Sequence, residues 1–185
     1  MATTAYGADI VQELTSAMAQ IARHEAEELT EAVAASRKIF VTGMGRSGLM
    51  MKSLAMRLMQ MGFQAYVVGE TVTPNMEKGD TLIIGSGSGE TAGLVSIAEK
   101  AKKLGGRIAV MTINRESTIG RLADITVILP GSPKDAAEGA GRSVQPMGTL
   151  FEQTLLLFCD AIVLSLMREQ GMDGAAMYGR HANLE

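Results

Sequence analysis

The chain has 185 residues, of which 46% are hydrophobic and 20% are charged, a composition that excludes a disordered or fibrous protein. Its 17 Lys and Arg against 20 Asp and Glu give a formal net charge of −3. That balance argues against nucleic acid as the main partner, because nucleic-acid-binding domains present a basic face.

The first part of the chain predicts helix over residues 8–36, because apolar side chains recur there at helical spacing. From residue 38 onward, short apolar strands alternate with helices. Strands are predicted at 39–42, 65–68, 81–84, 108–111 and 125–129, and helices at 49–61, 91–104 and 118–122. This alternation predicts an α/β fold, a doubly wound five-stranded parallel sheet flanked by helices.

The composition changes between residues 130 and 148, where three of the four prolines fall. A loop of this length is typical of a lid, a binding loop or a disordered stretch. A long C-terminal helix that is apolar almost all round is predicted at 149–168. Such a helix is buried on several sides, and we expect part of that burial to come from another subunit. No second domain is visible, so residues 1–185 are expected to form one domain.

Targeting and metal signals are lacking. The amino terminus has no basic segment followed by an apolar one, and the most apolar helix is interrupted by Glu152 and Asp160. The single cysteine, Cys159, follows an apolar run and is expected to be a buried, unreactive thiol. We therefore expect a cytoplasmic protein that inserts into no membrane and needs no metal or other cofactor.

A glycine-rich loop, Gly43-Met44-Gly45-Arg46-Ser47-Gly48, follows the first strand. It matches the G-x-G-x-x-G dinucleotide fingerprint, and Glu70 lies where an acid would bind the ribose. One interpretation is therefore a nicotinamide-binding oxidoreductase. The other is a tight turn that uses glycine for its backbone geometry.

A second loop, Gly85-Ser86-Gly87-Ser88-Gly89-Glu90-Thr91, follows the third strand. Its glycines let the backbone approach a ligand, and the helix after it presents a positive dipole end that favours an anion. Ser86, Ser88 and Thr91 add hydroxyl groups on the same rim. A dinucleotide domain needs no second cradle, so a small phosphorylated metabolite fits better. The alternative for the two serines is a polar helix cap.

The pair GMGRSG and SGSGET, each after its strand, resembles the sugar isomerase (SIS) domain family, and the likeness runs from about residue 8 to residue 185. Within that family, the segment VVGETVTP and the ending RHANLE are similar to the 6-phospho-3-hexuloisomerase group. The resemblance implies a substrate-binding set of Gly45, Arg46, Ser47, Ser86, Ser88 and Thr91.

Glu152 has two interpretations. It lies in the first turn of the apolar helix, where Thr149-Leu150-Phe151-Glu152 fits the capping-box pattern. The resemblance instead implies that Glu152 is the catalytic base. His181 lies in the tail Tyr178-Gly179-Arg180-His181, where an exposed, idle histidine is the usual expectation. The resemblance implies a second catalytic residue there, supplied by a neighbouring subunit of a homo-oligomer, a tetramer by analogy.

The activity that the resemblance implies is isomerisation of D-arabino-3-hexulose 6-phosphate and D-fructose 6-phosphate through a 2,3-enediol. It also implies the ribulose monophosphate route of formaldehyde fixation, or its reverse supplying pentose phosphates, and a functional link to 3-hexulose-6-phosphate synthase. Two alternatives stay open on the same scaffold. One is a non-catalytic SIS sensor of a sugar phosphate, and the other is an aldose–ketose isomerase acting on a substrate such as arabinose 5-phosphate.

Overall fold

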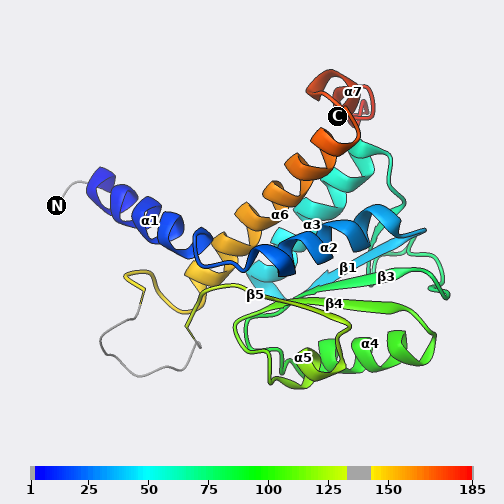
Figure 1. The fold of residues 1–185 in the computed structure, drawn as a ribbon, viewed down its shortest axis with the longest axis horizontal. Helices are drawn as coiled ribbons and strands as arrows, with labels where there is room; N and C mark the ends of the chain where they lie inside the picture. Colours follow the sequence, from blue (N-terminus) through cyan, green and yellow to red (C-terminus); the bar gives the residue numbers. More distant parts are fainter. Residues whose placement is uncertain (1–2, 133–142, 185) are drawn as a thin grey trace.

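A computed structural model describes residues 3–132 and 143–184. Its five strands form one parallel sheet in the order β2-β1-β3-β4-β5, between two layers of helices (Figure 1). The predicted α/β class and all five predicted strands are confirmed. The strands are β1 (Ile39–Gly43), β2 (Ala65–Val67), β3 (Thr81–Gly85), β4 (Arg107–Thr112) and β5 (Ile125–Ile128).

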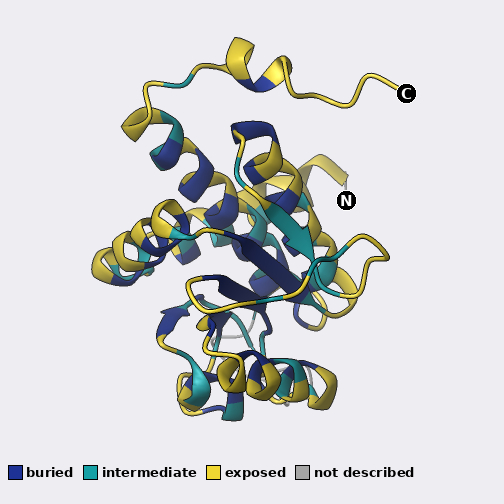
Figure 2. Ribbon diagram, turned by 90° about the vertical axis from the view of Figure 1, so that its right-hand side faces the viewer, coloured by how far each residue is buried: buried dark blue, intermediate teal, exposed yellow. Residues whose placement is uncertain are grey.

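Each face of the sheet has its own apolar core. Along β3, Ile83 packs in the core under α2 (Arg23–Ala35), α3 (Gly45–Met61) and α6 (Thr149–Glu169). Leu82 and Ile84 pack in the other core, under α4 (Ala92–Lys103) and α5 (Thr118–Leu122). Because successive strand residues point to opposite faces, an uninterrupted apolar run fills both cores. The central strands are accordingly buried, while the helices expose their outer faces (Figure 2).

The predicted amino-terminal helical stretch, 8–36, consists of two helices, and the break between them was not predicted. Helix α1 (Thr3–Met18) ends before residues 19–22, and α2 starts at Arg23. Both helices contact α6, but α2 also lies on β5 of the sheet. In Figure 1 α1 stands out from the layered body, and Ala17 is its one buried residue among those described. A further short helix, α7 (Gly174–Tyr178), was not predicted.

Helix α6 is the one helix in the described part of the chain that is long and apolar enough to cross a membrane, judged by length and composition alone. Half of its most apolar stretch is buried inside the fold. The helix packs extensively along α3 and also touches α1 and α2. Cys159 on this helix is buried as predicted, and burial raises the pKa of its thiol.

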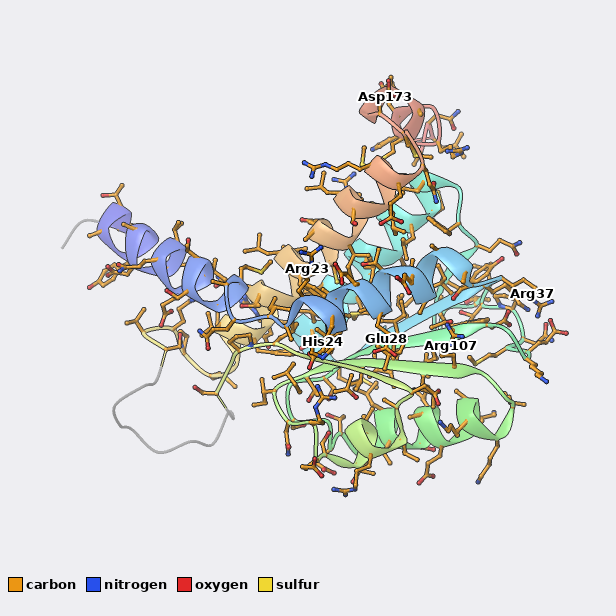
Figure 3. All side chains as sticks on the ribbon, viewed as in Figure 1. Arg23, His24, Glu28, Arg37, Arg107 and Asp173 are labelled. Carbon is orange, nitrogen blue, oxygen red and sulfur yellow. The ribbon has the colours of Figure 1, made fainter. Side chains whose placement is uncertain are left out.

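A charged network ties the amino ends of β1 and β3 together, at the end of the sheet where Arg37 is labelled in Figure 3. Asp80 is fully buried; its Oδ1 accepts from Arg37 Nε at 3.1 Å and its Oδ2 from the backbone amide of Glu77 at 2.8 Å. Lys38 Nζ donates to the Asn75 carbonyl and to Glu77 Oε2. These contacts anchor the long connection from β2 to β3 to the sheet.

Candidate active site

The two glycine loops begin side by side at the carboxyl edge of the sheet. Gly43, the last residue of β1, is the register partner of Gly85, the last residue of β3. After these neighbouring strands the chain enters α3 on one face and α4 on the other, which makes this point the topological switch of the sheet, where ligands of doubly wound folds bind. A cavity of about 330 Å³ opens here. Its lining includes Met44, Gly45, Ser47, Ser86, Gly87, Ser88, Thr91, Leu94, Ile113, Ser132, Gly148, Phe151 and Glu152.

Glycine is required at two points of these loops. A Cβ on Gly48 would lie 2.6 Å from the Gly43 carbonyl oxygen, so the first turn of α3 folds back onto the end of β1 only without a side chain. Gly89 has a positive φ of +64°, and a Cβ there would lie 2.0 Å from Ser117 Oγ. The first loop is therefore the start of α3, which begins at Gly45 and not at residue 49 as predicted.

The serine hydroxyls of the second loop make hydrogen bonds within the loop itself. Ser86 Oγ accepts from the Gly89 amide at 3.2 Å, and Ser88 Oγ accepts from the Glu90 amide at 3.2 Å. Both amides lie before α4, which has no side-chain cap, so the polar-cap alternative for these serines is wrong. A hydroxyl that accepts through its oxygen still has its proton to donate. Both serines line the cavity, where that proton is available to a ligand.

Three long helices begin at this cavity without a side-chain cap among the described residues. Their N-cap residues, which are Met44 for α3, Thr91 for α4 and Gly148 for α6, all line the cavity. The first amides of a helix lack intrahelical partners, and the helix dipole adds partial positive charge at that end. The cavity is therefore suited to an anion, and a phosphate is the anion that such N-termini bind most often.

Glu152 lies against this positive region with its side chain only 7% exposed. Arg46 Nε lies 2.7 Å from Glu152 Oε2, which joins the first turn of α3 to the first turn of α6. The capping-box interpretation is wrong, because Thr149 donates its hydroxyl to the Pro146 carbonyl at 2.7 Å and the N-cap is Gly148. The carboxylate is thus held in the cavity wall by a half-exposed arginine.

His181 lies elsewhere in the same chain. It lines a separate groove between α3, α6 and α7 with residues that include Arg57, Asp160 and Leu164. Its ring stacks on Tyr178, with 6.0 Å between centroids, and the segment after α7 is exposed (Figure 2). The residues that line this groove and those that line the cavity have no member in common, so His181 and Glu152 of one chain lie at separate places.

The structure therefore brings together most of the predicted site. Gly45, Ser47 and Glu152 line the cavity with the three hydroxyl residues of the second loop, and Arg46 joins it through the ion pair. Glu70, the ribose-binding candidate, instead pairs with Lys52 at 3.1 Å. The sequence interpretation missed the apolar wall of the cavity. Its members are Leu94, Ile113 and Phe151.

The sequence matches the SIS domain family over residues 32–157, and the chain belongs to that family. It is 54% identical to the 3-hexulose-6-phosphate isomerase of Bacillus subtilis (strain 168) over 185 residues, all of both chains. It is 40% identical to the enzyme of the same name from Mycobacterium gastri over 173 residues, 94% of this chain and 86% of that one.

A solved structure from Methanococcus jannaschii, for which a molecular function of 3-hexulose-6-phosphate isomerase was inferred, has a TM-score of 0.78. Its sequence identity to this chain is 36%, and the match covers 88% of this chain and 87% of that one. The five-stranded sheet with its flanking helices is therefore the SIS fold, as the glycine loops predicted.

Proposed function

We propose that this protein is an isomerase that interconverts D-arabino-3-hexulose 6-phosphate and D-fructose 6-phosphate. The observation that carries the proposal is the pairing, in one cavity, of an anion cradle with a buried carboxylate that is free of a capping role. The 54% identity to the Bacillus subtilis enzyme supports the choice of substrate.

The substrate phosphate binds at the second loop and the start of α4. Ser86, Ser88 and Thr91 donate hydroxyl protons to its oxygens, and the uncapped amides at the start of α4 complete the cradle. Ser47 contributes from the start of α3, beside Gly45, whose lack of a side chain leaves room for the ligand. The phosphate anchors one end of the sugar, so the carbons that react are held at a set distance from it.

Glu152 is the base. It removes the proton from C2 of the hexulose, the C2–C3 double bond forms, and the C3 carbonyl oxygen takes up a proton to give the 2,3-enediol. Return of the proton to C3 and loss of the O2 hydroxyl proton give the C2 ketone of fructose 6-phosphate. Arg46 holds the Glu152 carboxylate in place, and its guanidinium is close enough to the reacting carbons to stabilise charge that develops on the substrate oxygens.

The oxygen-bound protons require a second group, and we assign that role to His181 of a neighbouring subunit. The protein is then a homo-oligomer, a tetramer by analogy with the family. Large apolar side chains are exposed around the groove that holds His181, including Leu164 at 57% and Tyr178 at 78%. A homo-oligomer would cover such residues.

We also propose that the enzyme acts in the cytoplasm, in the ribulose monophosphate pathway of formaldehyde fixation. A 3-hexulose-6-phosphate synthase supplies its substrate.

Proton NMR of fructose 6-phosphate in D₂O with the protein tests the reaction. The wild type is expected to remove the C3 proton signal, since the enediol exchanges that proton with solvent. Glu152→Gln should abolish exchange, whereas Glu169→Gln, at the exposed end of the same helix, should leave it unchanged. Exchange at C1 would indicate an aldose–ketose isomerase, and binding without exchange would indicate a sensor.

A further inference from the structure

Helix α1 is hydrogen-bonded through Glu13 to the segment that precedes α6. The carboxylate of Glu13 accepts three hydrogen bonds from residues 143–145, which precede α6. Its Oε1 accepts from the Val144 amide at 2.8 Å. Its Oε2 accepts from Ser143 Oγ at 2.9 Å and from Gln145 Nε2 at 3.2 Å. In Figure 1 this segment, drawn in yellow, lies beside α1.

No cation pairs with Glu13 among the described residues, so its charge is balanced by these donors. A carboxylate accepts at both oxygens, and here both are used. Gln145, whose side-chain amide donates to Glu13, is itself buried. Its backbone amide donates to Ser143 Oγ at 3.0 Å. The contact is therefore an ordered cluster between α1 and the segment that precedes α6, and it differs from a chance surface hydrogen bond.

The clamped segment continues directly into the turn that carries the proposed base. The Pro146 carbonyl accepts from both the amide and the hydroxyl of Thr149, and the Gly148 carbonyl accepts from the Glu152 amide at 3.0 Å. Met147 has a φ of 56°, a left-handed conformation that costs energy for a residue with a side chain. Such a conformation persists only where surrounding contacts hold it. Clamp, strained turn and base follow one another within ten residues, from Ser143 to Glu152.

We propose that Glu13 is a positioning residue of the isomerase, which holds residues 143–145 and thereby fixes the start of α6 and the carboxylate of Glu152. The inference rests on the function proposed above. It also gives α1 a role that its packing does not, because Ala17 is its only buried residue within the described chain. The phosphate cradle is on the loop after β3, outside the clamp, so Glu13 acts on turnover and not on phosphate binding.

The test compares Glu13→Ala with Asp9→Ala. Asp9 is an exposed acid one turn earlier on α1 that lines the same groove as Ser143 and Val144, but its side chain makes no hydrogen bond or ion pair with the described residues. Misplacing a catalytic group by about 1 Å costs up to roughly 100-fold in rate, so Glu13→Ala is expected to lower kcat by about 10- to 100-fold. Its KM and unfolding midpoint should stay near the wild-type values, and Asp9→Ala should match the wild type throughout.

A double-mutant cycle with Ser143→Ala separates positioning from a general loss of order. If the two residues act through one clamp, the double variant should lose no more kcat than Glu13→Ala alone. The inference is overturned if kcat of Glu13→Ala stays within twofold of the wild type. It is also overturned if KM rises while kcat holds, or if the losses of the two variants multiply.

Amide hydrogen exchange without substrate distinguishes this inference from the proposed function. Glu13→Ala should speed exchange at Val144 and Glu152 and leave the amides of β3 protected, since these depend on global stability. If the wild type shows no isomerase activity but this exchange pattern is found, the clamp stands and the proposed function fails. Unchanged exchange at Val144 would refute the clamp itself.

Discussion

Replacing Gly89 by alanine should displace the loop after β3, which forms the proposed phosphate cradle, and lower the stability of the fold. Gly89 has a φ of +64°, and a Cβ there would lie 2.0 Å from Ser117 Oγ and 2.5 Å from Ser117 Cβ. Ser117 is fully buried and cannot move outward. Its Oγ caps α5 by accepting from the Gly120 amide at 3.1 Å, so rotating the side chain away would break that cap.

The magnitude follows from these two contacts. A left-handed backbone costs a residue with a Cβ about 1 to 2 kcal/mol relative to glycine. Losing the α5 cap adds about 1 kcal/mol. The sum, about 2 to 3 kcal/mol, is a large part of the 5 to 15 kcal/mol that is typical of a whole domain. Because the Gly89 amide donates to Ser86 Oγ, the displaced loop should also bind phosphate more weakly.

Urea unfolding of the wild type, Gly89→Ala and Gly45→Ala measures this cost, with inorganic phosphate titration as the second assay. Gly45 is the matched control, because its φ is +57° and its Cβ would meet no atom within 4 Å. Gly45→Ala should therefore lose only the backbone part, about 1 to 2 kcal/mol. Equal losses of stability in the two variants would refute the argument from Ser117.

Three further predictions test other parts of the molecule. Glu152→Gln should abolish turnover while inorganic phosphate still binds; near-normal turnover in an activity assay would exclude Glu152 as the base. Thr154→Val should raise the unfolding free energy by about 1 kcal/mol in urea, because Thr154 Oγ1 is buried with no hydrogen-bond partner among the described residues. Hydrogen bonds from Arg37, then Lys38, lower the pKa of Glu77 from 4.5 to about 2. Glu77 should therefore stabilise the fold above pH 4.5 and lose that effect as the pH falls towards 2, so acid titrations of wild type and Glu77→Gln should converge at low pH.

The sequence predicted the sheet well because each strand carries its own signal. Short apolar runs that are bounded by glycine and separated by helical patterns are typical of strands in a parallel sheet with helices on both faces. The meeting of the two glycine loops was also predictable, since both follow strands and the carboxyl ends of parallel strands share one edge. The extent of the domain, residues 1–185, stays a prediction.

Local patterns failed where tertiary contacts decide the outcome. Thr149 and Glu152 have capping-box spacing, yet the carboxylate pairs with Arg46 on a helix about one hundred residues earlier in the chain. Helix α1 has an apolar stripe like that of α2, and only the packing of each helix shows that the chain breaks between them. The hydrogen bonds of Glu13 to residues 143–145 were equally hidden, because an acid on an amphipathic helix usually faces solvent.

The lack of side-chain caps at the described starts of α3, α4 and α6 makes the cavity suited to an anion although the chain is acidic overall. A side-chain cap on α3, α4 or α6 would use the amides that now face the cavity, and it would place an oxygen where a phosphate or an enediolate oxygen is expected. Short helices of the same chain, α5 and α7, do have caps, from Ser117 and Asp173. The helix starts at the cavity thus keep their donors for a ligand. Glu152, held by Arg46, places a carboxylate at the same cavity, which is the group that the proposed proton transfer requires.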